Sequence, residues 1–222
     1  MNTTDHAVLR LLHLSSAGLP VGAYAFSHGL EYAIEAGWLK KDADIERWLS
    51  AQLRFSVATL DLPILLRLGQ ALAINDHTAV RYWNALILAS RETHELQLTD
   101  TATGLALQKL LPEFGVPVIT IQGPVSFVTA FAQAAQHWAI DAHMAGLGLC
   151  WSWIENQVNA ATKLLPMGQT QAQRMMHSLQ AQVPAAIAAA ANVEDDSMGA
   201  SLPALSLASM HHETQYSRLF RS

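Results

Sequence analysis

A long segment in the middle of the chain carries almost no charge. No lysine or arginine occurs between Lys109 and Lys163, and only three acidic residues lie between them. Glutamines, histidines and a proline interrupt the apolar residues, so the segment lacks the run of about 18–20 apolar residues that a membrane span requires. A helix that is apolar nearly all round is usually buried among other helices or in a subunit interface. The segment therefore predicts covered helices and no membrane span.

Charge is scarce over the whole chain as well. Charged residues make up 14% of its 222 residues, against about 25% in an ordinary soluble domain, and apolar residues make up 51%. We expect part of this apolar surplus to face other protein surfaces. The formal net charge is −5 and no stretch is strongly basic, which excludes a nucleic-acid-binding protein of the usual electrostatic kind.

The cysteine content and the N-terminus indicate the compartment. Cys150 is the only cysteine, which excludes an intramolecular disulfide and a cysteine-ligated zinc site and fits a reducing compartment. Asp5 and His6 stand where a signal peptide would carry lysine or arginine. We therefore expect a cytoplasmic protein whose first residues form a helix of the mature chain.

Apolar residues at three- and four-residue spacing predict helices over most of the chain. Ser27 is the expected cap of a helix over residues 30–36. Asp42 precedes a second helix, and Asp61, with Pro63 in the first turn, predicts the start of a third. Further helices are expected over residues 77–90, 99–111, 125–140, 142–164 and 169–191.

Two segments depart from the helical pattern. Residues 116–121 are strand-like, but because one strand cannot form a sheet, we expect an extended connector. Residues 194–199 form an acidic break, and an aromatic and basic terminus follows it. Such a terminus either stays frayed or becomes ordered on a partner protein. The sequence thus predicts an all-α, single-domain helical bundle over residues 1–192, with a flexible linker and C-terminal tail over residues 193–222.

One short motif raises the alternative of a serine hydrolase. Residues 25–29 resemble a degenerate nucleophile elbow around Ser27, with Asp141 and the histidines near the C-terminus as later members of a triad. That elbow requires a strand leading into the serine and a parallel sheet beneath it, and the sequence predicts neither. The capping role of Ser27 is therefore the favoured interpretation.

Ten histidines raise a second alternative, a nickel-binding carrier. His137 and Asp141 are four residues apart and could share a helix face, and His211, His212 and Glu213 form a small donor group. A structural or catalytic site usually assembles three or four fixed ligands, so we assign no metal site from the sequence. The chain also lacks the G-x-x-x-x-G-K-[ST] motif, which excludes nucleotide hydrolysis by the P-loop route.

Four segments, in order along nearly the whole chain, resemble the UreF family of urease accessory proteins. They read LPVGAYAFSHGLE at residues 19–31, RETHEL at 91–96, AATKLLPMGQ at 160–169 and HETQYSRLFRS at 212–222. One segment alone would be a weak match, whereas the four together are specific.

The resemblance implies an all-α protein that is not an enzyme and needs no cofactor of its own. Members of this family form dimers, bind the accessory protein UreD (or UreH), recruit the GTPase UreG and join it to the urease apoprotein. The assembly loads nickel into urease with GTP hydrolysis by the GTPase. We therefore expect a homodimeric adaptor, with residues 125–160 as its dimer face.

The resemblance also predicts two sets of contact residues in this sequence. The residues expected to face the GTPase are Glu31, Arg91, Glu92, Glu95 and Lys163. The residues expected to face UreD/UreH lie in the tail: His212, Glu213, Gln215, Tyr216, Arg218, Leu219 and Phe220.

Overall fold

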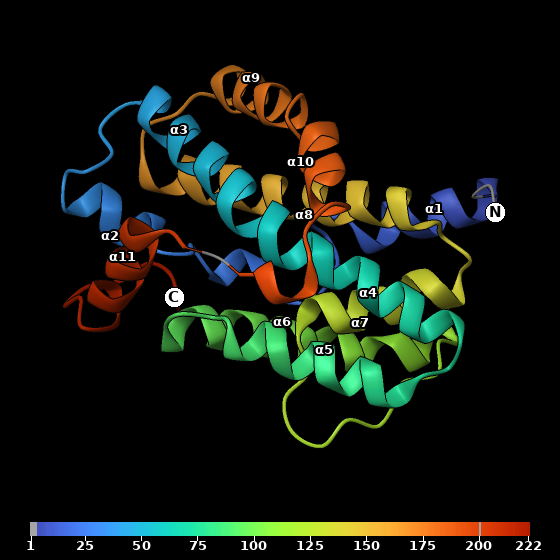
Figure 1. The fold of residues 1–222 in the computed structure, drawn as a ribbon. Helices are drawn as coiled ribbons and strands as arrows, with labels where there is room; N and C mark the ends of the chain where they lie inside the picture. Colours follow the sequence, from blue (N-terminus) through green and yellow to red (C-terminus); the bar gives the residue numbers. More distant parts are fainter. Residues whose placement is uncertain (1–3, 200) are drawn as a thin grey trace.

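The computed structural model of the chain describes residues 4–199 and 201–222. Within these ranges it holds helices and loops and no strand, which confirms the predicted all-α class (Figure 1). The α-helices are α1 (Asp5–Leu14), α2 (Leu30–Glu35), α3 (Asp42–Gln52), α4 (Leu62–Ala73), α5 (His77–Ala89), α6 (His94–Leu110), α7 (Phe127–His137), α8 (Ala142–Leu164), α9 (Gln169–Gln180), α10 (Val183–Ala190) and α11 (Pro203–Glu213). Shorter or irregular helical segments are η1 (Ala23–Ala25), η2 (Leu53–Asp61), η3 (Leu111–Phe114) and η4 (Asp195–Ser197).

Helices α3 and α4 are joined into one continuous rod by the π-helical segment η2. Pro63 lies in the first turn of α4, as predicted. Asp61, however, has helical backbone angles and makes no cap bond, so the helix continues through it. Because proline has no N–H, it leaves the carbonyl four residues earlier without its usual donor. That carbonyl, on Thr59, accepts the N–H of Gly199 at 3.1 Å.

The rod from Asp42 to Ala73 is long and apolar enough to cross a membrane by length and composition. Half of its most apolar window is buried inside the protein, however, and a core helix passes the same test. Its buried residues include Ile45, Leu49 and Leu68, which are 0% exposed.

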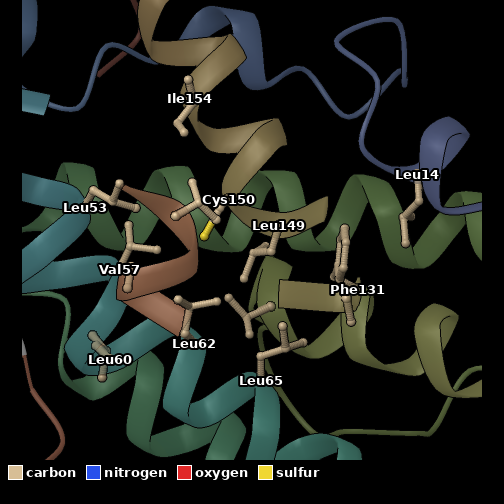
Figure 2. Close-up of a cluster of buried hydrophobic side chains, with 14 of the residues drawn as sticks. Leu14, Leu53, Val57, Leu60, Leu62, Leu65, Phe131, Leu149, Cys150 and Ile154 are labelled. Carbon is tan, nitrogen blue, oxygen red and sulfur yellow. The ribbon is translucent and has the colours of Figure 1, made fainter. Parts of the chain in front are cut away.

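Helix α8 forms the middle of the core. Figure 2 shows Leu149, Cys150 and Ile154 of α8 facing leucines and a valine of the rod, with Phe131 of α7 beside them. Burial, with a smaller contribution from the charge of Asp61, raises the pKa of the Cys150 thiol to about 12. The thiol is therefore protonated at neutral pH and packs as an apolar group.

The predicted ends of the helices are mostly close to the observed ones. Helix α8 has the predicted bounds and is capped by Asp141, whose Oδ1 accepts the N–H of Met144 at 2.8 Å. Helix α6 begins five residues earlier than predicted, because the hydroxyl of Thr93 caps it. The expected helix over residues 169–191 is two helices, α9 and α10, and Pro184 lies in the first turn of α10. Residues 116–121 form an irregular connector, as expected.

The segment expected to be a flexible tail packs against the rest of the protein. Asp195 pairs with Arg67 at 2.8 Å, and α11 packs on α2 and α6 (Figure 1). Gly29 permits this approach, since its backbone is left-handed, with φ +73°, and a Cβ there would lie 3.2 Å from the backbone nitrogen of Ser209. The contrast with the sequence expectation arises because the residues that hold α11 are distant in sequence. Residues 1–3 and 200, which fall in the predicted N-terminal helix and the linker, lie outside the described ranges.

A glycine also sets the distance between α6 and the start of α7. A Cβ on Gly104 would lie 2.1 Å from the carbonyl oxygen of Val125 and 2.7 Å from the backbone nitrogen of Phe127. We expect Gly104→Ala to destabilise the fold by about 3 kcal/mol, because two backbones must separate. The measurement is the free energy of unfolding in denaturant.

Gly69→Ala is the matched control for that substitution. Gly69 lies inside α4 with no atom within 4 Å of a built Cβ. Alanine there should stabilise the protein by about 0.5–1 kcal/mol through helix propensity. Equal effects of the two substitutions would contradict the close approach at Gly104.

Candidate functional site

A histidine enclosed by two carboxylates joins α11 to the N-terminal half of the chain. His212 Nε2 lies 3.0 Å from Glu31 Oε2, and Nδ1 lies 2.9 Å from Glu95 Oε2. Arg218 Nη1 donates to Glu95 Oε1 at 3.1 Å. His212, Glu31 and Glu95 are buried. We call these four residues the histidine cluster.

The geometry of this cluster favours a charged imidazole. Ionised carboxylates accept and cannot donate, so a ring with a carboxylate at each nitrogen needs a proton on both. Burial alone would lower the pKa of His212, but its hydrogen bonds to Glu95 and Glu31, and their charges, raise the pKa above the ordinary value of 6.5. The imidazolium and the Arg218 guanidinium together balance the two carboxylates.

The last residues of the chain are held by the same region. Glu31 accepts the backbone N–H groups of Leu219 at 2.6 Å and Phe220 at 2.8 Å. The N–H of Arg221 donates to the carbonyl of Ala25 at 2.7 Å, and the hydroxyls of Ser222 and Thr99 lie 2.6 Å apart. The terminus thus lies along the loop that leads into α2.

A second buried ion cluster lies between the rod, α6 and the start of α7. Arg91 donates from Nη2 to Asp61 Oδ1 at 2.6 Å and from Nε to Asp100 Oδ2 at 2.9 Å. Asp100 Oδ1 also accepts the hydroxyl of Ser126 at 2.8 Å and the N–H of Phe127 at 2.7 Å. Burial opposes the charge on Arg91, yet the two carboxylates raise the pKa of Arg91 above its ordinary value. Asp61, Arg91, Asp100 and Ser126 are called the arginine cluster below.

A cavity of about 130 Å³ lies against the arginine cluster. Arg91 and Asp100 line one part of it, and Leu202 and Leu205 of the C-terminal region line another. His28 also lines it, and burial, with the nearby charge of Arg91, lowers the pKa of His28 to about 4. The imidazole of His28 is therefore neutral at pH 7. Both carboxylates of the arginine cluster contact the one guanidinium of Arg91, so the cluster keeps a formal net charge of −1.

Some of the residues predicted to face the GTPase lie inside the protein, and others lie at its surface. Glu31 and Glu95 meet at His212, whereas Arg91 belongs to the arginine cluster. Glu92 is exposed and accepts the hydroxyl of Ser206. Lys163 is exposed, and its ammonium lies over the ring of Tyr24, 5.7 Å from the centroid, and over that of Phe220 at 5.5 Å. Their contacts with a GTPase stay predictions.

The residues predicted to face UreD/UreH are divided in the same way. His212 and Phe220 are buried, and Gln215 donates to Glu35 and to the carbonyl of Ser217. The exposed members of the set are Glu213, Tyr216, Arg218 and Leu219. Their contacts with a partner stay predictions as well.

The residues weighed for the two alternative functions are not brought together. Ser27 is buried, its hydroxyl accepts the N–H of Glu31 at 3.4 Å, and no strand leads into it in the described residues. His137 ends α7 while Asp141 caps α8, so they do not share a helix face. His211 stacks on Tyr32, and both nitrogens of His212 are bonded. The described part of the chain holds no group of three or more ligands suited to a metal ion.

Sequence reasoning missed the acidic half of the arginine cluster. Asp61 and Asp100 lie 30 and 9 residues from Arg91 in the sequence, and only the folded chain shows that both converge on it. The sequence offered one signal for Asp100. It is an aspartate within a predicted helix, and its neighbours in the sequence are mostly uncharged.

Removing Asp100 should cost far more than removing an exposed ion pair. Asp100→Ala leaves the Ser126 hydroxyl and the Phe127 N–H without an acceptor and Arg91 with one carboxylate, so we expect a loss of about 3–5 kcal/mol in the free energy of unfolding. Asp195→Ala, which breaks the exposed pair with Arg67, should cost less than about 1 kcal/mol. Denaturant unfolding measures both, and similar losses would contradict the buried role of Asp100.

Comparison with known proteins supports the resemblance to the UreF family. A sequence model of the UreF family matches residues 39–180. The chain is 50% identical over 222 residues to the urease accessory protein UreF of Marinomonas sp., covering 99% of this chain and 96% of that protein. It is 46% identical over 221 residues to the UreF of Teredinibacter turnerae, covering 98% and 100%, and 45% identical over 218 residues to that of Hahella chejuensis, covering 97% and 98%. The chain belongs to the UreF family of urease accessory proteins.

Proposed function

We propose that this chain is an adaptor that bridges the GTPase UreG and UreD/UreH on the urease apoprotein and thereby modulates GTP-dependent nickel insertion. In this proposal the chain is a cytoplasmic homodimer, is not an enzyme and binds no cofactor, and nickel is the cargo of the complex. Its work is a coupling free energy between partners. The family membership supports the general role, and the surface of the C-terminal segment supports the finer one.

The C-terminal segment, residues 203–222, presents apolar side chains on a backbone that is already fixed. Tyr216 is fully exposed and Leu219 is 64% exposed, and Leu207 and Met210 of α11 are exposed as well. Aromatic and aliphatic anchors of this kind dominate binding energy at interfaces. Because the histidine cluster already holds the segment, a partner that binds it has less ordering entropy to supply. This surface is the observation that carries the UreD/UreH assignment.

On the GTPase side, Glu92 and Lys163 are the two predicted residues whose charged groups lie at the surface. Lys163 follows a long segment without another base, so its charge is available to an acidic group of a partner. Glu31, Arg91 and Glu95 are engaged inside the protein, so in this proposal they support the contact surface by fixing the backbone.

Only part of the segment proposed as the dimer face, residues 125–160, has apolar side chains that a second copy could cover. Most of α7 is already buried within one chain. On α8, Met144, Leu147 and Trp151 are half-buried, so a second copy has apolar side chains to cover there. We place the proposed dimer contact on that face of α8.

The UreD/UreH assignment predicts that the double variant Tyr216→Ala, Leu219→Ala loses partner capture. We expect UreD/UreH to co-purify at least about tenfold less with it, because two exposed anchors are removed. Ile74→Ala is the control, since Ile74 is 76% exposed at the end of α4. Circular dichroism should show unchanged helix content. Full capture by the double variant would refute the assignment.

The GTPase assignment predicts a charge-specific effect at Lys163. Lys163→Ala should weaken co-purification with UreG and make the remaining binding less sensitive to salt, because one interfacial charge is lost. Lys109→Ala removes a charge from another exposed position on α6 and should leave binding unchanged. If both variants bind UreG like the unaltered chain, Lys163 lies outside the interface.

A further inference from the structure

We propose that the cavity against the arginine cluster is a binding site for a small neutral molecule that carries a carboxamide group. The class of ligand follows from the size of the cavity, from a buried glutamine without a partner, and from the unpartnered imidazole of His28. The site goes beyond the function proposed above, and its test uses the chain alone, without UreD/UreH or UreG.

The cavity is large enough for a small molecule and reaches the surface at one side. Its volume of about 130 Å³ is close to that of an engineered protein cavity of about 150 Å³ that binds benzene, so a ligand of about six non-hydrogen atoms fits. Among the described residues that line the cavity, Glu92 alone is exposed, and the others are buried or half-buried. A ligand therefore enters beside Glu92 and then lies mostly out of contact with solvent.

Gln52 supplies a hydrogen-bonding group that the described part of the protein leaves unused. Its side chain lines the cavity, the residue is 3% exposed, and its Nε2 has no hydrogen-bond partner. A buried amide N–H group without an acceptor costs free energy, so most buried polar groups in proteins have a partner. The carbonyl oxygen of a bound molecule would supply the acceptor that Gln52 lacks.

His28 supplies the complementary group. Its imidazole lines the same cavity and makes no hydrogen bond to a described residue. Burial and the charge of Arg91 keep the ring neutral at pH 7, so one of its nitrogens is an acceptor. The residue also has a left-handed backbone, with φ 51°, a conformation that is uncommon outside glycine and that clusters at active sites and ligand clamps. An N–H group of a ligand is the partner that the ring lacks.

The charges on the wall favour a neutral ligand over an ion. Arg91 lines the cavity together with Asp61 and Asp100, and both carboxylates pair with it. The donors of Ser126 and Phe127 also stabilise the carboxylate of Asp100. An anion in the cavity would face two carboxylates and a cation would face the guanidinium, in a poorly solvated site where like charges are costly. The described residues also hold no group of three or more ligands suited to a metal ion.

A carboxamide matches the groups that lack partners. It carries a carbonyl acceptor and an NH₂ donor on one planar group, so it can accept from Gln52 and donate to His28. Val57 and Leu149 line the cavity as well and would pack on a hydrocarbon substituent. Because Leu205 of α11 also lines the cavity, the bound molecule would contact both the helical body and the C-terminal segment.

Three compounds of the same shape and different charge test the proposal on the unaltered chain. Isobutyramide is neutral, isobutyrate is an anion and isobutyramidine is a cation, and each is titrated by NMR at pH 7 into the chain labelled with ¹⁵N. We expect isobutyramide to bind one site with a Kd of about 1 mM, in the range open to so small a ligand. The two ions should bind at least about tenfold more weakly. Equal or tighter binding of either ion, or no saturable binding of the amide, would overturn the proposal.

Gln52→Leu tests whether the amide binds in this cavity. Leucine is close to glutamine in size and removes the unpartnered amide, so the variant should be at least as stable in denaturant as the unaltered chain. It should bind isobutyramide at least about tenfold more weakly, because the ligand carbonyl loses its donor.

Gln157→Leu is the matched control for that substitution. Gln157 is 0% exposed, neither of its amide atoms has a hydrogen-bond partner, and it does not line this cavity. The control should change stability in the same direction as Gln52→Leu and leave binding of isobutyramide unchanged. Equal binding by Gln52→Leu and the unaltered chain would place the ligand elsewhere and refute the site.

The ring signals of His28 give a second measurement that needs no variant. The ¹⁵N signals of its imidazole should shift with the concentration of isobutyramide, whereas those of His211, which stacks on Tyr32, should not. If Gln52→Leu fails to fold, these shifts and the ranking of the three compounds still decide the question. Unchanged His28 signals at saturating isobutyramide would contradict the proposal. No partner takes part, so the result is independent of the adaptor role.

Discussion

The position of the C-terminal segment depends on one imidazolium shared by two carboxylates. Glu31 and Glu95 come from helices that no local sequence rule brings together, and their charges would repel each other without His212 between them. Once the cation is present, Glu31 has capacity left for two backbone N–H groups, which fixes the path of the last residues. The imidazolium thus acts together with the Thr93–Ser209 hydrogen bond and the stacking of His211 on Tyr32 to hold α11 in place.

The arginine cluster also places opposite charges in contact inside the protein. The carboxylates of Asp61 and Asp100 compensate Arg91, and Asp100 also ties down the first turn of α7 through Ser126. Buried charges require opposite charges or hydrogen-bond donors close by, and here Asp100 has both Arg91 and the donors of Ser126 and Phe127. The two clusters therefore act as fixed points between elements whose remaining contacts are apolar and less directional.

What the sequence predicted well was set locally. Helix α8 was predicted with its observed bounds from apolar periodicity, and the all-α class followed from many such signals. The join at η2 was not predicted, because the carbonyl of Thr59, before Pro63, accepts its hydrogen bond from the distant N–H of Gly199. The site was half predicted: the four segments singled out all the residues of the histidine cluster, and Arg91 as well, but not which of them touch one another. They also missed Asp61 and Asp100, the partners of Arg91. Glu31 and His212 are 181 residues apart, and only the folded chain shows that they touch.

This placement changes how variants of the predicted contact residues should be interpreted. A substitution at Glu31, Glu95 or His212 disturbs the charge balance that holds the C-terminal segment, so it would weaken partner binding even if no partner touches that residue. A substitution of the exposed side chain of Tyr216 or Leu219 alters the surface and leaves both ion clusters intact. Binding loss in the first group therefore reports on the support of the interface, whereas loss in the second reports on the interface itself. Only the second group can locate a partner on this protein.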